Sequence, residues 1–306
     1  MTHAMSLKQR LTTAGMLIAP GAYDAIGARL IEQAGFGAVY MTGAGTSAAY
    51  GYPDFGLLTM SEMVENAGRL AKSIGVPLIA DADTGYGNEL NVIRTVREYE
   101  ARGVSAIHIE DQVAPKRCGH LDGKEVVSRS EFVSKIKAAV EARRSEQFVI
   151  IARTDSRAVV NFDEAVWRAN AALDAGAEIA FVEATQSMDE VSLVPRLVKG
   201  PCLLNVVGGG RTPLFDLREA EAMGYKVAIV PGVMLQAAIQ AGDAALKSLQ
   251  QTHQPATASQ TVGQTFRRLG ADEWEGYRQR YNAGPATTNI GLSGLAAASL
   301  DVAKVR

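Results

Sequence analysis

Residues 77–83 read Pro-Leu-Ile-Ala-Asp-Ala-Asp, an apolar run that stops abruptly at two carboxylates. A short, almost wholly apolar run predicts a strand that is buried on both faces, as in a parallel sheet. Apolar residues then recur at Val92, Val96, Tyr99 and Ala101 with the spacing of a helix. The segment therefore predicts one unit of a strand followed by a helix that packs against it.

The same unit recurs along the chain on both sides of this stretch. Short apolar or β-branched runs, each followed by a helical pattern, lie at residues 16–19, 38–43, 77–83, 106–111, 148–155, 179–184, 202–207 and 227–232. Eight units in about 240 residues match the size of a closed (β/α)8 barrel of the TIM type, an α/β fold. An open doubly wound sheet would normally carry a glycine-rich phosphate-binding turn after its first strand. The first turn here instead reads Pro-Gly-Ala-Tyr-Asp, at residues 20–24.

Local signals mark where several of the helices begin and end. A Ser or Thr followed three residues later by Glu predicts a capping box, and such pairs stand at Thr59/Glu62, Ser128/Glu131 and Ser187/Glu190. Helix ends are indicated by glycines that can adopt a left-handed conformation, at Gly35, Gly176 and Gly224.

We predict a barrel domain at residues 1–250 and a C-terminal helical extension at 251–306. Residues 251–260 (QTHQPATASQ) are polar and lack periodicity, as in a linker. Residues 265–281 predict one or two short helices, and residues 285–299 are rich in Gly, Ala, Thr and Ser. We expect this extension to serve assembly rather than chemistry.

The composition predicts a soluble, cytoplasmic protein with a small-molecule partner. The 306 residues are 47% hydrophobic and 21% charged, with a formal net charge of -2. Without a cationic surplus, neither nucleic acid nor an anionic membrane is an expected partner. No apolar run is long enough to span a bilayer, and no secretory signal is evident. Two cysteines, Cys118 and Cys202, are too few for a disulfide scaffold.

Ionisable and amide residues end five of the predicted strands. These residues are Asp81 with Asp83, Glu110, Arg153, Glu183 and Asn205. The active site of a parallel barrel forms where the carboxyl ends of its strands meet. A purely structural protein has no reason to collect such residues there, so the sequence predicts a site at this rim.

Three of these residues predict a magnesium site. Asp81 and Asp83 stand two apart, so in a strand they would face the same side, and Glu110 comes from the next strand. Carboxylates this close repel one another unless a proton or a cation intervenes. Hard oxygen ligands of this kind suit Mg²⁺, which keeps several waters. The alternative is that these acids cap helices or pair with Arg153.

A long loop after the fourth strand carries a cysteine among cationic residues, in Lys116-Arg117-Cys118-Gly119-His120. Loops of this length often act as lids. The sequence neighbours of Cys118 would favour its thiolate and make it a usable acid or base. Cys202, in contrast, fits the pattern of a small buried apolar residue. The alternative for His120 is a solvated loop residue.

Two further features suit a carboxylate ligand. Thr42-Gly43-Ala44-Gly45 offers backbone N–H groups near a strand end. The planar guanidinium of Arg153 suits a carboxylate or an oxyanion. The alternatives are a tight turn for the first feature and, for Arg153, an ion pair with Glu110 or Glu183.

Four segments together resemble the isocitrate lyase/phosphoenolpyruvate mutase superfamily. They are Asp81–Gly87 (DADTGYG), Ile109–Gln112 (IEDQ), Lys116–His120 (KRCGH) and Ala152–Asp155 (ARTD), in the expected order and at fitting spacings. The KRCGH loop resembles that of the carbon–carbon lyases of the superfamily, of the 2-methylisocitrate lyase and 2,3-dimethylmalate lyase type.

The resemblance implies a role for each residue of the predicted site. Asp81 would bind Mg²⁺, or Mn²⁺, directly, while Asp54, Asp83 and Glu110 would hold its waters. The residues expected at the substrate are Thr42, Gly43, Ala44, Gly119, Arg153, Glu183 and Asn205, with Lys116, Cys118 and His120 closing over it. The resemblance also implies a homotetramer, a dimer of dimers, that exchanges a terminal helix between barrels.

One departure from the family pattern leaves the reaction open. Many relatives carry a glutamate where this chain has Gly208. The favoured hypothesis is a Mg²⁺-dependent lyase that cleaves a 2-hydroxy di- or tricarboxylate, of the 2-methylisocitrate or 2-alkylmalate type, into an α-keto acid and a carboxylate. In it Cys118 would protonate the carbon, with Arg153 stabilising the charge. The alternatives are an oxaloacetate hydrolase or decarboxylase, and a non-catalytic barrel that binds dicarboxylates.

Overall fold

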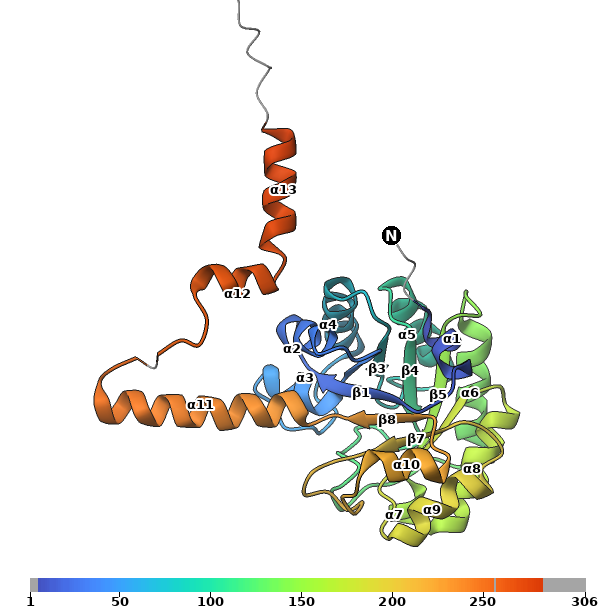
Figure 1. Cartoon of the computed structure of the whole chain (residues 1–306). Helices are drawn as coiled ribbons and strands as arrows, with labels where there is room; N and C mark the ends of the chain where they lie inside the picture. The colour runs from blue at the N-terminus through green and yellow to red at the C-terminus, as the bar shows by residue number, and fades with distance from the viewer. Residues whose placement is uncertain (1–4, 256, 283–306) are drawn as a thin grey trace, which may run out of the picture. The chain divides into compact units, whose positions relative to one another are not determined.

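The computed structural model describes residues 5–255 and 257–282, and its core is a closed barrel of eight parallel strands (Figure 1). The strands are β1 Leu17–Ala22, β2 Val39–Met41, β3 Leu78–Asp81, β4 Ala106–Glu110, β5 Val149–Thr154, β6 Ile179–Val182, β7 Cys202–Asn205 and β8 Val227–Val230. Each strand pairs with the next along the chain, and β1 closes the barrel against β8. The predicted (β/α)8 barrel is thus confirmed.

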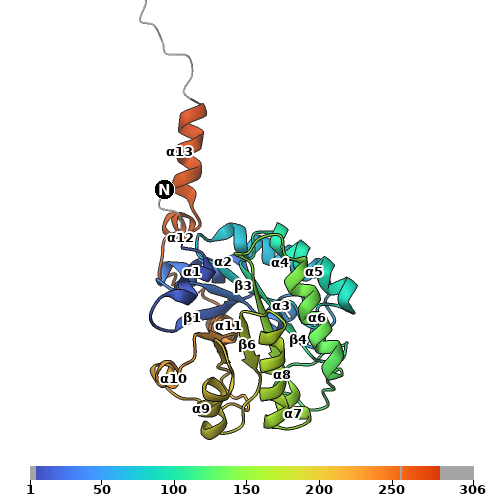
Figure 2. The same cartoon turned by 90° about the vertical axis from the view of Figure 1, so that its right-hand side faces the viewer.

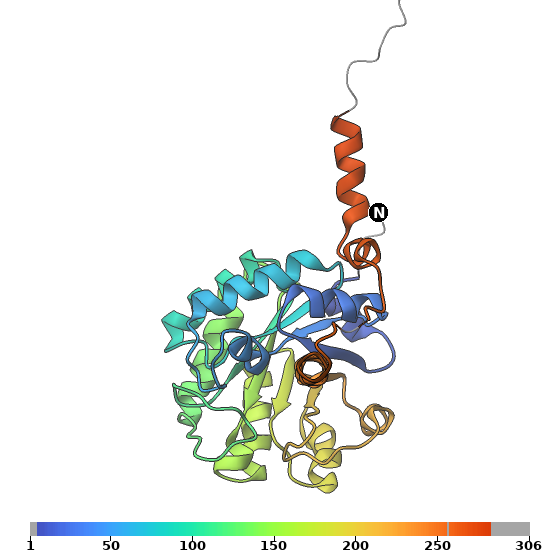
Figure 3. The same cartoon turned by 90° about the vertical axis from the view of Figure 1, so that its left-hand side faces the viewer.

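Helices follow the strands and surround them, as Figures 2 and 3 show from opposite sides. They are α1 Leu7–Thr12, α2 Ala25–Gln33, α3 Gly43–Ala49, α4 Met60–Ser73, α5 Glu89–Ala101, α6 Arg129–Ala142, α7 Ser156–Val159, α8 Phe162–Asp174, α9 Met188–Leu197, α10 Leu217–Met223 and α11 Val233–Thr252. Two of them, α3 and α7, are short additions directly after the carboxyl ends of β2 and β5.

The helix signals in the sequence are found at the expected positions, but two of the three predicted capping boxes, Ser128/Glu131 and Ser187/Glu190, lack the reciprocal contact. Thr59 and Glu62 form a reciprocal capping box at the start of α4. Ser187 caps α9 through the backbone N–H of Glu190. The Glu190 carboxylate accepts from the Gln186 backbone N–H and pairs with Arg157, so that box is not reciprocal. Gly35, Gly176 and Gly224 all have positive φ angles, between 90° and 105°.

The inside of the barrel is filled by side chains. One buried cluster draws on all eight strands and takes only Leu7 from the helices, which places it within the barrel rather than between strands and helices. Its members include Ala19, Tyr40, Ile79, Ala106, Ile151, Phe181, Leu203 and Ile229. Because the interior is packed in this way, a ligand site has room only at an end of the barrel.

The first strand runs further than the sequence predicted. Residues 20–22, expected in a turn, belong to β1, and Gly21 pairs with Tyr40 of β2. A Cβ at Gly21 would collide with the backbone of Pro231, so glycine permits the close approach of the chain at the end of β8. The turn begins only at Tyr23, before Asp24 caps α2.

The chain forms two compact units, Met1–Ala256 and Thr257–Arg306. Within the first, α11 runs outward from the end of β8 in Figure 1 and has no buried residue. The described part of the second unit forms two helices, α12 Val262–Arg268 and α13 Ala271–Tyr281. The predicted segment 285–299 lies outside the described residues. Among the described residues, no helix is long and apolar enough to cross a membrane.

Candidate active site

A cavity of about 170 Å³ opens at the carboxyl ends of the strands, where the sequence predicted a site. It is lined by Tyr40, Thr42, Ala44, Gly45, Asp54, Asp81, Cys118, Gly119, His120, Arg153, Glu183, Asn205, Val207, Pro231, Gly232, Leu235 and Gln236. Ten of these residues had been predicted at the site. Larger hollows along α5 and α6 are open, and none of the predicted site residues lines them.

Asp81, the last residue of β3, is buried and firmly held. One carboxylate oxygen accepts the backbone N–H of Gly43 at 3.2 Å, and the other accepts that of Asp83 at 2.9 Å. Burial would raise the pKa of Asp81, but His108 first, and then Lys116 and Arg153, hold it down at about 2. The pKa of buried His108 falls to about 4, which leaves the ring neutral at pH 7. Lys116 is therefore a principal cation that keeps Asp81 ionised.

Asp83 reaches the site by a route that the sequence reasoning missed. It lies beyond the end of β3 with a φ of 45°, so the expectation that it shares a strand face with Asp81 is wrong. This left-handed turn brings one Asp83 carboxylate oxygen to 2.9 Å from Nζ of Lys116. Burial, with repulsion from Asp81 and Asp54, raises the pKa of Asp83 to about 6.

Lys116 places its positive charge among these carboxylates. Its buried ammonium lies 2.5 Å from Oδ1 of Asp54 and 2.9 Å from Oδ1 of Asp83. Burial would lower the pKa of Lys116, but the surrounding carboxylates, Asp83 and Asp54 first, raise it well above its ordinary value. The contact joins the loop that carries Lys116 to the segment that carries Asp54, which is only partly buried.

Glu110 completes the acidic cluster at the end of β4. Its Oε2 lies 3.1 Å from Nε of Arg153, but neither of its two buried carboxylate oxygens has a hydrogen-bond partner among the described residues. Burial, with repulsion from Asp155 and Asp81, raises the pKa of Glu110 well above its ordinary value. A buried oxygen without a donor, beside carboxylates that repel one another, indicates that a proton or a cation belongs here.

The donor set fits a hard divalent cation that takes few direct protein ligands. Over residues 5–255 and 257–282, no group of three or more His, Cys, Asp or Glu side chains is arranged to hold one ion. Mg²⁺ needs no such cage, because it retains several waters and binds through one or two carboxylates. Asp81, Asp83, Asp54 and Glu110 supply oxygen ligands of the kind that it prefers.

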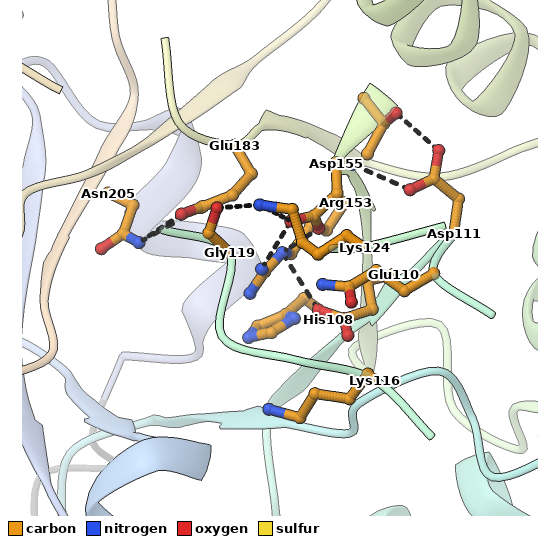
Figure 4. A network of polar contacts seen from close by, with 12 residues as sticks. His108, Glu110, Asp111, Lys116, Gly119, Lys124, Arg153, Asp155, Glu183 and Asn205 are labelled. Atoms are coloured by element: carbon orange, nitrogen blue, oxygen red, sulfur yellow. Dashed lines mark hydrogen bonds and ion pairs between the residues drawn. The ribbon is translucent and has the colours of Figure 1, made fainter. Parts of the chain in front are cut away.

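Arg153 is oriented by a partner that the sequence reasoning did not select. Its guanidinium donates to both carboxylate oxygens of Asp155, at 2.8 and 3.1 Å (Figure 4). It also lies over the ring of Phe181. Asp155 is positioned in turn by Asp111, which accepts its backbone N–H at 2.8 Å. Asp111 also pairs with buried Arg168 of α8 at 3.1 Å. A buried network of two ion pairs joined by a backbone hydrogen bond therefore fixes the orientation of Arg153.

The loop after β4 lies over the cavity. Nε2 of His120 is 3.0 Å from Oε1 of Glu183, whose carboxylate also accepts two hydrogen bonds from Nδ2 of Asn205. Buried Lys124 donates to the carbonyl oxygen of Gly119 (Figure 4). Burial would raise the pKa of Glu183, but Arg153 and His120 hold it down at about 2. The loop residues thus meet the residues that end β6 and β7.

The protonation state of Cys118 differs from the expectation. Burial raises the pKa of its thiol, and the Asp54 and Glu183 carboxylates act in the same direction. The cationic sequence neighbours do not offset this, because the Lys116 ammonium turns to Asp54 and Asp83. The thiol is therefore protonated at neutral pH, and the expectation of a thiolate is wrong. A protonated thiol at a cavity wall is suited to donate a proton.

Four predicted residues lie just behind the cavity wall rather than in it. Gly43 and Asp83 bind the Asp81 carboxylate through their backbone N–H groups. Lys116 and Glu110 contact Asp54 and Arg153. Sequence reasoning missed Tyr40, Asp155, Lys124 and Leu235. Asp155 alone had a usable signal, since it ends the ARTD segment at the same rim.

Comparison with known proteins gives a consistent result over most of the chain. The family model described as phosphoenolpyruvate phosphomutase matches residues 7–250. A 2,3-dimethylmalate lyase from Eubacterium barkeri is 50% identical over 242 residues, which cover 79% of this chain and 84% of that protein. A 2-methylisocitrate lyase from Aeropyrum pernix is 42% identical over 243 residues, 79% of this chain and 78% of its own length.

Solved structures with the same architecture include proteins of other activities. An oxaloacetate acetylhydrolase bound to 3,3-difluorooxalacetate is 37% identical, with a TM-score of 0.88 over 93% of this chain and 98% of that one. A phosphonopyruvate hydrolase in complex with oxalate and Mg²⁺ is 31% identical, with a TM-score of 0.82 over 92% of this chain and 99% of that one.

Proposed function

The chain belongs to the isocitrate lyase/phosphoenolpyruvate mutase superfamily, and from this premise we propose that it is a Mg²⁺-dependent carbon–carbon lyase. It would cleave a 2-hydroxy dicarboxylate into an α-keto acid and a simple carboxylate. The observation that carries the proposal is the placement of the Cys118 thiol in the wall of a cavity that also exposes Asp81 and Arg153, where burial raises the pKa of the thiol. This cleavage needs three groups: a proton donor to carbon (Cys118), a carboxylate that binds the cation (Asp81) and a cationic side chain that binds the substrate carboxylate (Arg153).

The polar wall of the cavity suits the half of the substrate that becomes the α-keto acid. Arg153 lines the cavity, and Asp155 fixes the orientation of its planar guanidinium. Thr42 and Ala44 line the same cavity at the start of α3. We propose that this group holds the carboxylate next to the hydroxyl-bearing carbon. Glu183 and Asn205 line the same cavity, with Glu183 next to Arg153, and together with His120 they would contact the second fragment.

The proposed cleavage is a retro-Claisen step. The hydroxyl group releases its proton to solvent, the electron pair left on oxygen forms the new carbonyl bond to C2, and the bond between C2 and C3 breaks. The electron pair of that bond passes to C3 and delocalises into the neighbouring carboxylate. Cys118 then donates its thiol proton to C3, while Arg153 stabilises negative charge as it develops. The loop above the cavity would exclude water from the reactive intermediate.

The residues proposed to hold the ion are Asp81, Asp83, Asp54 and Glu110, in part through water. When bound, Mg²⁺ would lower the pKa of the substrate hydroxyl and stabilise the keto oxygen that forms. A related hydrolase has been solved with Mg²⁺ and oxalate, which supports this assignment. Mn²⁺ has similar oxygen preferences and would be expected to substitute.

The cavity favours an alkylated malate over a tricarboxylate. Val207, Pro231 and Leu235 form an apolar part of its wall. Arg153 and His120 are the only basic side chains that line it among the described residues, and His120 is paired with Glu183. A third carboxylate would therefore meet an apolar surface, at a large desolvation cost, whereas an alkyl group would gain from the contact. The greater identity to the dimethylmalate lyase points the same way.

Oxaloacetate hydrolysis is the second candidate, and the similarity to an oxaloacetate acetylhydrolase favours it. In this chain Gly208 leaves open space near the cavity, since a Cβ there would have no neighbour within 4 Å. Hydrolysis would need a water molecule to attack the keto carbon of the substrate. An apolar wall at the substituent end gives no advantage to oxaloacetate, which carries no alkyl group.

Steady-state kinetics with a substrate panel would separate these candidates. The purified protein with Mg²⁺ would be given 2,3-dimethylmalate, 2-ethylmalate, 2-methylisocitrate, isocitrate and oxaloacetate, with release of α-keto acid or oxalate followed. We expect kcat/KM for a 2-alkylmalate to exceed that for 2-methylisocitrate by at least about tenfold, or ~1.4 kcal/mol. Preferential release of oxalate from oxaloacetate would favour the hydrolase. No turnover of any member would favour a binding barrel.

A further inference from the structure

A second loop contacts His120 from outside the cavity. Gly210 and Arg211 belong to the connection between β7 and α10, far from His120 in the sequence. The backbone N–H of Arg211 donates to Nδ1 of His120 at 3.0 Å, and Nε of Arg211 donates to the carbonyl oxygen of His120 at 3.2 Å. The Arg211 guanidinium also pairs with Asp122 on the same loop as His120. Three contacts thus converge on one short segment.

The backbone contact determines which nitrogen of His120 carries a proton. A backbone N–H can only donate, so Nδ1 must accept, and the proton of the neutral ring resides on Nε2. That nitrogen lies 3.0 Å from Oε1 of Glu183. The protonated nitrogen is therefore the one close to Glu183, although the pair does not meet hydrogen-bond geometry in the structure.

The loop after β7 has a glycine, Gly210, where it comes closest to the His120 ring. A Cβ at Gly210 would lie 2.8 Å from Nδ1 and 2.9 Å from Cε1 of His120, which is inside van der Waals contact. A side chain at residue 210 would thus displace the ring. Gly208, two residues earlier, has no neighbour within 4 Å of its Cβ position, and its φ is not positive. The tight fit is therefore confined to the glycine that faces His120.

The ion pair between Arg211 and Asp122 contributes little to holding the loop in place. The Asp122 side chain is 93% exposed, so its attraction to Arg211 is weakened by water and salt. The Arg211 side chain is only 31% exposed and also holds a backbone carbonyl of the other loop. Its main consequence is geometric, because it joins the loop over the cavity to the loop after β7.

We propose that Gly210 and Arg211 are positioning residues for the reaction. Gly210 and the Arg211 backbone seat the His120 ring with its proton on Nε2, and the Arg211 side chain holds residues 117–124 over the cavity. Neither residue lines the cavity. The protonation of the His120 ring and the position of the loop can both be measured in the resting protein, so they do not depend on the proposed lyase activity.

The predicted protonation of the His120 ring is tested by nitrogen-15 NMR of histidine-labelled protein. The chain has four histidines, and a His120→Gln variant would identify the His120 signals. We expect the wild-type ring to show a protonated Nε2 and an accepting Nδ1. Gly210→Ala should change this pattern, and Gly208→Ala should not. A protonated Nδ1 in the wild type, or an unchanged ring in Gly210→Ala, would overturn the proposal.

The role of the Arg211 side chain is tested by limited trypsin digestion. Loss of the contacts should expose the loop, so Arg211→Ala should be cut after Arg117 and Lys124 several times faster than wild type, with Arg211→Lys in between. In active enzyme, kcat should fall about 10-fold or more with a smaller change in KM. Equal cleavage rates for the wild type and Arg211→Ala would refute the side-chain role. If no substrate is turned over, the NMR and digestion results still decide the inference.

Discussion

Gly119 lies where the loop comes closest to the substrate-binding residues, and Gly119→Ala is predicted to disable the enzyme without unfolding it. The new Cβ would lie 2.5 Å from Nη2 of Arg153 and 2.6 Å from Cγ of Glu183. Neither neighbour can yield easily. Arg153 is held by both oxygens of Asp155, and Glu183 is held by Asn205 and His120. The loop must therefore move outward.

The size of this movement sets the expected loss. Restoring ordinary contact requires a shift of about 1 Å, and a misplacement of that size at a catalytic group can cost about 10²-fold. Because Cys118 and His120 flank residue 119, we expect kcat to fall by about that factor. The strain is relieved at the surface loop rather than in the core, so Tm should change by no more than about 2 °C.

The assay compares kcat and Tm for wild type, Gly119→Ala and the matched control Gly208→Ala. Gly208 lies in the facing loop, and its added methyl group has no neighbour within 4 Å. The control should therefore keep kcat and Tm near the wild-type values. Wild-type kcat in Gly119→Ala would refute the closed loop geometry. A large drop in Tm would instead show that the loop cannot move independently of the barrel.

Three further predictions concern the metal, the proton donor and the C-terminal extension. Exhaustive chelation should abolish activity, Mg²⁺ or Mn²⁺ should restore it, and Asp81→Ala should stay inactive with the fold intact by circular dichroism; full activity after chelation would exclude the metal assignment. Cys118→Ser should lower kcat by about 10²–10⁴-fold with little change in substrate binding, because a hydroxyl is a far weaker acid than a thiol. A near wild-type kcat in this variant would remove Cys118 from the mechanism. A chain that ends at Gln250 should lose its oligomeric state by light scattering. Retention of both the oligomer and full activity would show that residues 251–306 do not serve assembly.

The barrel was predictable because its strands are buried on both faces. Such strands appear in the sequence as continuous apolar runs, and the polar residues that end them must gather at one rim. Asp81, Glu110, Arg153, Glu183 and Asn205 were found in this way. The end of β1 was misjudged, because a Pro-Gly pair usually marks a turn, while here the glycine permits contact with the neighbouring chain.

Properties that depend on spatial neighbours were beyond the sequence. Cys118 stands among cationic residues in the chain, yet in space its burial, together with the Asp54 and Glu183 carboxylates, raises the pKa of its thiol and reverses the expected direction of the shift. Asp83 reaches the acidic cluster through a left-handed turn rather than along a strand. Leu235 approaches the cavity from α11, and nothing in its own segment indicates a ligand.

Cleavage of 2,3-dimethylmalate in D₂O tests the central claim most directly. The protein with Mg²⁺ would be incubated with this substrate, and the products would be quantified by NMR and mass spectrometry. Breaking the bond between C2 and C3, with proton delivery to C3, must yield pyruvate and propionate in equal amounts. The propionate must carry one deuterium at C2, since an exchanged thiol supplies the deuteron. We predict this result for the wild type and a loss of at least about 10²-fold in its rate for Cys118→Ser. The absence of pyruvate from the wild-type reaction would contradict the account.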